Sequence, residues 1–352
     1  MSEDVWSEQD TNPDAIEAAL RDLLRHRHAE NEAFVPARVL TLVVIVDREW
    51  KGEIANRLER VGRYQASRTV LCAVEEGRTE LDAVATVSYD DPGETGFAPM
   101  REKVEIDLGP EHLEGLPTIV DPVLVAGMPT VLWSPHGHSD DVHRLLGMID
   151  VVLLDSDDAP EPAEAFARAQ ELGEFAYVVD LAWLRTTPWR ERLAASFDLR
   201  QRLPALHHIT ELEIRHQATS TASGLLLTGW LASRLGWDRS PLQAQDSAGL
   251  RGTARRPPGE QVEVRLSGLA QDAPGLGGVT VVCEHGTSLS LQRGQGGLDA
   301  RERDSDGSER EWKILGASRG ERGILGEGVR QGHLRDPTYG PALAAARELC
   351  PA

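Results

Sequence analysis

The stretch "RVLTLVVIVDREWKGEIANRLERVGRYQASRTVLCAV" (residues 38–74) contains two apolar runs on either side of an amphipathic segment. Residues 38–47 and 67–74 have the length of buried strands and are rich in β-branched side chains, which favour strands. Between them, apolar side chains recur at three- and four-residue intervals, which predicts a helix over 50–64. The succession of strand, helix and strand is typical of an α/β fold.

The alternation of strands and helices continues through the first half of the chain. It predicts strands over 81–90, 103–108, 128–134 and 150–156, a helix that begins at Asn12-Pro13, and helices over 139–149, with Ser139 as N-cap, and 162–172. The run at 150–154 is apolar on both faces, as is typical of central strands in a parallel sheet. We therefore expect an N-terminal α/β domain with a mixed, largely parallel sheet.

The pattern changes after residue 180, where single helices are followed by a group of strands. It predicts helices over 189–197, 221–237, 320–331 and 337–349, a strand over 207–217, an antiparallel meander over 261–268, 278–286 and 287–293, and surface loops over 238–259 and 296–311. This composition indicates a second domain of the α+β class. We expect the domains to span 1–178, with an acidic, partly flexible N-terminus, and 179–352.

The formal charge of the 352-residue chain is −20 and is unevenly distributed. Residues 1–180 carry 15 Lys and Arg against 37 Asp and Glu, a net charge of −22, whereas residues 181–260 carry 11 against 7, a net charge of +4. The acidity argues against binding to nucleic acid or to anionic membranes. The asymmetry suits docking onto another protein, although an acidic surface also serves solubility alone.

The sequence also bears on the cellular compartment. No apolar run approaches the ~18–20 residues that a membrane-spanning helix needs, and the acidic N-terminus lacks the features of a secretory signal. The three cysteines, Cys72, Cys283 and Cys350, are scattered and odd in number, which argues against a disulfide framework or a metal site. We expect a cytoplasmic protein.

The segment "DLAWLRTTPWRERLAASFD" (180–198) places two of the eight tryptophans beside three arginines. A helix over 188–197 aligns Trp189, Leu193 and Phe197 in one stripe, while Arg190 lies off that stripe, so folding is expected to need it little. Three interpretations remain open: a core helix whose arginines pair with acids, an anion pocket, and a protein interface, because Trp and Arg are enriched in binding hot spots. The residues predicted to bind a partner are Asp180, Trp183, Arg185, Trp189, Arg190 and Arg192.

Catalytic motifs are missing from the sequence. We find no nucleophile elbow, metalloprotease helix, Cys-x-x-Cys pair or kinase motif set. The segment "SPHGHSDDVH" (134–143) contains His136 and His138 close to two aspartates, which permits a metal site, but a solvated turn between a strand and a helix explains it better. We therefore predict no catalytic residues, no metal ligands and no cofactor.

The segment 180–198 resembles the characteristic motif of the glucose-6-phosphate dehydrogenase assembly protein family, OpcA. Further stretches fit that family in the same order: "RVLTLVVIV", "GMPTVLWS" before "DVVLLDS", and "GLLLTGWLASRLGW". The resemblance covers roughly residues 34–349. The sequence departs from the family pattern where Ser134, rather than a second tryptophan, follows Trp133, and where "RYQASRTVLC" lacks a His-Pro pair. Neither departure touches the motif.

The resemblance implies a function without catalysis. Members of the family assemble or activate glucose-6-phosphate dehydrogenase at the entry to the oxidative pentose phosphate pathway, so we expect a chaperone-like partner and allosteric activator of that enzyme. Two enzymatic alternatives remain open from the residues alone. One is a sugar-phosphate enzyme that uses Arg185 and Arg190 as anion clamps, and the other is a metal-dependent hydrolase built on His136 and His138.

Overall fold

The computed structural model describes residues 2–36, 38–62, 67–89, 98–198, 202–245, 249–316, 320–332 and 334–351. The chain forms two compact units. Unit 1 comprises Met1–Leu154, Leu172–Val179 and Gly328–His333, and unit 2 comprises Asp155–Glu171, Asp180–Glu327 and Leu334–Ala352. The division of the domains at residues 178 and 179 stays a prediction.

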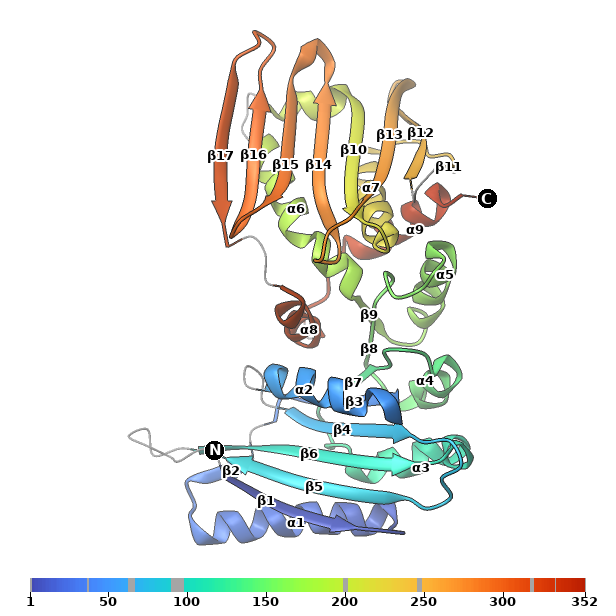
Figure 1. Ribbon diagram of the computed structural model, residues 1–352, viewed down its shortest axis with the longest axis vertical. Coiled ribbons are helices and arrows are strands. Elements are labelled where there is room, and N and C mark those ends of the chain that lie inside the picture. The colour runs from blue at the N-terminus through green and yellow to red at the C-terminus, as the bar shows by residue number, and fades with distance from the viewer. Residues whose placement is uncertain are drawn as a thin grey trace. The chain divides into compact units, whose positions relative to one another are not determined.

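Each unit contains one sheet, and Figure 1 labels its elements. The strands of the first sheet are β1 (Ser2–Glu8), β2 (Phe34–Pro36), β3 (Leu40–Asp47), β4 (Ser67–Val74), β5 (Asp82–Tyr89), β6 (Ala98–Leu108), β7 (Thr130–Trp133), β8 (Val151–Leu154) and β9 (Tyr177–Asp180). Those of the second are β10 (Ile209–Gln217), β11 (Gln243–Gln245), β12 (Gly249–Arg256), β13 (Glu260–Leu269), β14 (Leu276–Cys283), β15 (Ser288–Gly294), β16 (Gly297–Arg303) and β17 (Glu309–Leu315). The helices of the described residues are α1 (Pro13–Glu30), α2 (Lys51–Gly62), α3 (Leu116–Val120), α4 (Ser139–Leu145), α5 (Pro162–Leu172), α6 (Leu181–Phe197), α7 (Thr221–Leu235), α8 (Gly320–Gln331) and α9 (Tyr339–Leu349).

The sheet of unit 1 has the order β1-β5-β6-β4-β3-β7-β8-β9, with β2 paired to β6. Strands β6, β4, β3, β7 and β8 are parallel neighbours, and β5 and β1 add antiparallel pairs at one edge. This arrangement confirms the predicted mixed, largely parallel sheet. The strand order reverses between β3 and β7, which is the switch point of a doubly wound sheet.

Helices lie on both faces of this sheet, with α1 on one face and α2 on the other (Figure 1). Helix α1 begins as predicted, because the Asn12 side chain accepts a hydrogen bond from the backbone N–H of Ala15 at 3.0 Å. The N-terminal residues that were expected to be partly flexible form β1, which pairs with β5 over residues 2–8. No helix within the described residues is long and apolar enough to cross a membrane.

The sheet of unit 2 has the order β11-β12-β13-β10-β14-β15-β16-β17. Neighbouring strands within the described residues pair antiparallel, except β10 with β13, which are parallel. Helices α6 and α7 lie against one face of the sheet, and α9 packs along α7 (Figure 1). A Cβ at Gly229 would collide with the carbonyl oxygen of Ala342, so glycine at this position allows α7 and α9 to approach each other closely. The α+β class of the second domain is confirmed.

Four details were predicted wrongly, three in the second half of the chain and one at helix α4 in unit 1. The expected loops 238–259 and 296–311 contain β11 and β12, and β16 and β17. Strand β11 has the sequence QAQ, and in β12, β16 and β17 charged side chains outnumber apolar ones, so the apolar pattern of a strand is weak in the sequence. The expected meander is interrupted, because β10 lies between β13 and β14. Helix α4 is capped by His138, with φ of 58°, instead of Ser139.

Helix α6 is longer than the sequence predicts. Pro188 suggested a start near residue 188, because proline is favoured in the first turn of a helix. In the structure the helix begins at Leu181, with Asp180 as N-cap, and Pro188 lies inside it. Proline removes one backbone hydrogen bond, but most side chains of the first turns are buried, and their tertiary contacts stabilise the helix.

Candidate functional site

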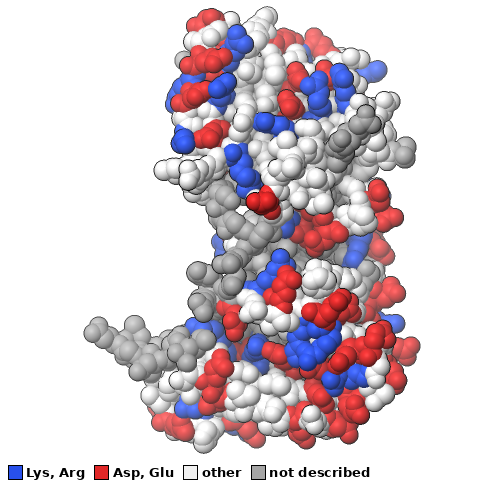
Figure 2. Space-filling view, viewed as in Figure 1, with Lys and Arg blue, Asp and Glu red and all other residues white. Residues whose placement is uncertain are grey.

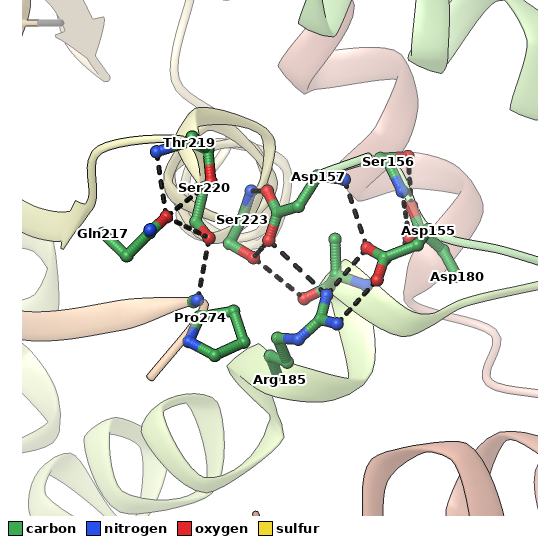
Figure 3. A network of polar contacts seen from close by, with 12 residues as sticks. Asp155, Ser156, Asp157, Asp180, Arg185, Gln217, Thr219, Ser220, Ser223 and Pro274 are labelled. Atoms are coloured by element: carbon green, nitrogen blue, oxygen red, sulfur yellow. Dashed lines mark hydrogen bonds and ion pairs between the residues drawn. The ribbon is translucent and has the colours of Figure 1, made fainter. Parts of the chain in front are cut away.

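A buried polar network surrounds the first turns of α6 in unit 2 (Figure 3). The guanidinium of Arg185 donates two parallel hydrogen bonds to the carboxylate of Asp155, at 2.7 and 2.6 Å. Asp157 lies 3.6 Å from the same guanidinium, and all three side chains are less than a tenth exposed. The bidentate geometry is the strongest form of an arginine–carboxylate pair, and it positions the segment after β8 against α6.

Two of the acids also cap helices. Asp180 accepts hydrogen bonds from the backbone N–H of Ala182 at 2.9 Å, from the Ser156 hydroxyl at 2.6 Å and from the Tyr339 hydroxyl at 3.1 Å. Asp157 accepts bonds from the backbone N–H of Ser223 at 3.0 Å and from its hydroxyl at 2.6 Å. Each carboxylate therefore satisfies an N–H group that would otherwise lack a partner at the N-terminus of a helix, α6 or α7.

The network holds more acid than base. Burial, followed by the charge of Asp155, raises the pKa of Asp157 to about 7. Burial also raises the pKa of Asp180 to about 6. The one guanidinium is in contact with two carboxylates, those of Asp155 and Asp157, so a proton on Asp157 relieves the excess negative charge near neutral pH.

A second cluster lies one turn further along α6. The guanidinium of Arg190 stacks 3.5 Å from the centre of the Trp183 ring and donates to the Thr186 hydroxyl at 2.9 Å. Asp336 accepts a hydrogen bond from the Trp183 indole at 2.9 Å and lies 3.4 Å from Arg190. Burial lowers the pKa of Arg190 to about 10. Arg190 is therefore integrated into the fold, contrary to the expectation that folding needs it little.

The structure brings together four of the six residues predicted to bind a partner, in these two clusters. Trp189 is 1% exposed and belongs to the predicted stripe with Leu193 and Phe197, both also buried. Arg192 is partly buried, and its Nε has no hydrogen-bond partner among the described residues. The role of the six residues in partner binding stays a prediction. The guanidinium groups of Arg185 and Arg190 are already engaged by acids and hydroxyls, which disfavours an anion clamp.

The C-terminal end of α6 lines a pocket of about 240 Å³ that the sequence analysis did not identify. Its lining is Leu193, Ala194, Phe197, Asp198, Leu206, Ile209, Trp230, Leu231, Arg234, Leu235 and Val281. The sequence contained a signal for it, since α7 carries apolar side chains around much of its circumference, and such a helix contacts more than one neighbour. The sequence does not reveal that α6 is one of these neighbours, which only the three-dimensional structure shows.

The switch point of the unit 1 sheet is where doubly wound folds bind dinucleotides, next to a glycine-rich turn after the first strand. Here β3 is followed by a 3₁₀ turn over Arg48–Trp50. The Trp50 ring stacks on His136 at 4.4 Å between ring centres. His138 contacts Asp47 at 3.1 Å and Asp141 at 3.0 Å. Bulky rings and a carboxylate at this turn do not fit a pyrophosphate, which needs close approach to backbone N–H groups.

These contacts also bear on the histidines considered for a metal site. Within the described parts of the chain, no group of three or more His, Cys, Asp or Glu side chains has the arrangement to hold a metal ion. His136, Gly137 and His138 have φ angles of 68°, 120° and 58°, a left-handed run that directs His138 between two carboxylates. The residues therefore build a turn between β7 and α4.

Both units are similar to known proteins. Residues 58–171 and 176–342 match the families described as glucose-6-phosphate dehydrogenase subunit N-terminal domain and C-terminal domain. The OpcA protein of Synechococcus elongatus, provisionally named an OxPP cycle protein, is 31% identical over 173 residues, which are 47% of this chain and 38% of that protein. The OpcA protein of Nostoc punctiforme, with the same name, is 33% identical over 141 residues, or 39% and 30% of the two chains.

The chain thus spans less than two fifths of the length of these relatives. Among solved structures, a super-repressor mutant of Gal80p from Saccharomyces cerevisiae matches with a TM-score of 0.50 at 11% identity, over 89% of this chain and 94% of that one. This likeness concerns the fold alone. The family matches extend over most of the sequence and include the motif at 180–198, so the chain belongs to the OpcA family of glucose-6-phosphate dehydrogenase subunits.

Proposed function

We propose that this chain is a non-enzymatic partner of glucose-6-phosphate dehydrogenase, acting in the cytoplasm on the oxidative pentose phosphate pathway. The observation that carries the proposal is the family match, which covers both halves of the chain, residues 58–171 and 176–342. The relatives that are named OxPP cycle proteins support the same pathway. The proposal explains the lack of catalytic motifs in the sequence.

Two features of the site favour a binding protein over an enzyme. The switch point of the doubly wound sheet is occupied by Trp50 and His136, in stacked contact, where a dehydrogenase would hold its dinucleotide. The arginines of the 180–198 motif are held by internal contacts to Asp155 and Asp336. Both places are therefore built from contacts within the chain.

Activation would follow from preferential binding to one state of the enzyme. A protein that binds the active conformation or assembly of the dehydrogenase more tightly than the inactive one shifts the equilibrium towards activity. A tenfold difference in affinity between the two states corresponds to about 1.4 kcal/mol. The acidic surface of unit 1, visible as red side chains in Figure 2, would contribute long-range charge steering to the encounter.

The test is the kinetics of the cognate dehydrogenase with and without this chain. We expect a lower KM for glucose 6-phosphate or a higher kcat, and a complex on a size-exclusion column. The chain alone, given glucose 6-phosphate and a nicotinamide dinucleotide, should show no turnover. Association should slow between 0.1 M and 1 M salt, as the Debye length falls from about 10 Å to about 3 Å. Unchanged kinetics without a complex would contradict the proposal, and turnover by the chain alone would show an enzyme.

A further inference from the structure

The pocket between α6 and α7 differs from the polar clusters at the other end of α6. Buried apolar side chains form its floor, among them Leu193, Phe197 and Leu231. Trp230 is half-buried at its side, and Ala194 is exposed on its α6 wall. The pocket lies entirely within unit 2, so its shape is set by the packing of one compact body.

Two opposite charges lie at the edge of the pocket. The side chains of Asp198, at the end of α6, and Arg234, in the last turn of α7, line the pocket and are exposed. Within the described parts of the chain, Arg234 has no ion pair or side-chain hydrogen bond. An apolar pocket with exposed charged side chains at its edge has the pattern of a protein interface, with a hydrophobic centre and a polar rim.

The size of the pocket decides between classes of occupant. Sites for cofactors and drug-sized ligands measure about 300–1,000 Å³, whereas this pocket measures about 240 Å³. The pocket is therefore smaller than a typical nucleotide site. Protein interfaces characteristically insert single large anchoring side chains into well-packed pockets of this kind.

We propose that this pocket is the docking point for the dehydrogenase, which inserts one large apolar side chain between α6 and α7 and places a carboxylate beside Arg234. The inference rests on the proposed function, and it places the contact on the 193–198 end of α6. Charge complementarity favours an acidic group on the partner at this point, because Arg234 lines the pocket, is exposed and has no ion pair within the described residues.

The decisive variant fills the pocket without removing a buried group. Ala194 is exposed and lines the pocket, whereas its neighbour Ala195 is equally exposed and points to another side of the helix. Ala194→Trp should weaken binding to the dehydrogenase about thirtyfold, as loss of a hot-spot contact does. Ala195→Trp serves as the matched control and should bind like the unmodified chain. Binding is measured by titration on a biosensor, and folding by thermal melting.

A second pair of variants tests the carboxylate. Arg234→Glu should weaken binding about fivefold at 0.1 M salt, and the difference should shrink at 1 M because charges at a rim are screened. Arg255→Glu, an exposed arginine on β12 away from the pocket, is the control and should leave the affinity unchanged. Equal effects of the two reversals would show that only net charge matters and would overturn the placement of the carboxylate.

The outcomes separate this inference from the proposed function. If the unmodified chain does not bind the dehydrogenase, the proposed function fails. If it binds and Ala194→Trp binds equally well while remaining folded, the docking point is wrong and the function stands. If the unmodified chain is a dimer on a size-exclusion column and Ala194→Trp is a monomer, the occupant is a second copy, which also overturns the inference.

Discussion

The two ends of helix α6 use the same residue types in opposite ways. At the N-terminal end Asp180, Arg185 and Arg190 are buried or nearly so, and each is bound to groups of its own unit. At the C-terminal end Leu193 and Phe197 form the floor of an open pocket, and the charged side chains at the rim are exposed. One continuous sequence motif therefore contains a structural half and an accessible half.

The difference teaches that enrichment in Trp and Arg does not locate an interface by itself. These residues dominate hot spots because they combine a large apolar surface with directional hydrogen bonds, and the same properties make them effective inside a fold. Buried charge is tolerated only when it is paired. The number of internal partners that a charged side chain has, which a sequence does not reveal, separates the two uses.

The largest expected effect comes from a comparison of two tryptophans, Trp189 in the core and Trp230 at the pocket. Trp189→Ala should lower the free energy of unfolding by about 3–5 kcal/mol, since Trp189 is 1% exposed and its loss leaves a cavity. Trp230→Ala, at the half-buried pocket wall, should cost about 1 kcal/mol. Chemical denaturation measures both. Equal losses would mean that the pocket end is as much a part of the core as the other end.

The next effect comes from the buried ion pair. Arg185→Met keeps the length of the side chain but leaves Asp155 and Asp157 without their cation. Breaking such a pair costs about 3–5 kcal/mol, and we expect about 3 kcal/mol at pH 7, because protonation of Asp157 offsets part of the loss. The measurement is denaturation at pH 7 and pH 8.5, with a larger loss at the higher pH. A loss below ~1 kcal/mol would argue that the network is not structural.

Arg190 should have an intermediate effect. Arg190→Ala removes the stacking contact with Trp183 and the bond to Thr186, whereas Asp336 keeps its bonds to Trp183 and Thr338. A desolvated cation–π contact contributes about 2 kcal/mol, so the melting temperature should fall by several degrees. Arg234→Ala, the control at the open end, should change the free energy of unfolding by less than ~0.5 kcal/mol. A larger loss of stability for Arg234→Ala than for Arg190→Ala would contradict the distinction between the two ends of α6.

Local periodicity was sufficient to predict most of unit 1. Strands β3 and β4 and the start of α1 at Asn12 followed from apolar runs and from capping chemistry in short windows. Strands β16 and β17 were missed because charged residues fill their exposed positions, and their pairing joins residues 297–303 to 309–315 across a polar turn. The position of β10 between β13 and β14 depends on contacts that no local pattern contains.

The candidate site was predictable in its members but not in their roles. The motif at 180–198 drew attention to Trp183, Arg185 and Arg190, because rare aromatic residues stood beside arginines. The structure places Arg185 in one buried cluster and Trp183 with Arg190 in another. Their partners Asp155, Asp157 and Asp336 lie far away in sequence, and no local pattern connects them with the motif. Pro188 also concealed the first two turns of α6, so its N-terminal cap could not be placed.

The smallest effect is a dependence of stability on pH. Burial and the charge of Asp155 raise the pKa of Asp157 to about 7 in the folded chain, above the value of about 3.9 in an unfolded chain. The folded state therefore binds this proton more tightly, and stability falls as the pH rises from the unfolded to the folded pKa. Between pH 6 and pH 8 the free energy of unfolding should decrease by about 1 kcal/mol through this group.

Asp157→Asn removes the titrating group. The variant tests whether ionisation of Asp157 causes the decrease in the free energy of unfolding between pH 6 and pH 8. The amide oxygen still accepts from the backbone N–H of Ser223, so the cap of α7 is retained. The variant should lose most of the slope between pH 6 and pH 8. A small slope should remain from Asp180, whose pKa burial raises to about 6. Melting curves at pH 6, 7 and 8 measure the slopes, with Asp198→Asn, at the exposed end of α6, as the control that keeps the original slope. If both variants keep the original slope, Asp157 is ionised throughout this range. Arg185 then stabilises the charged forms of both Asp155 and Asp157 at neutral pH.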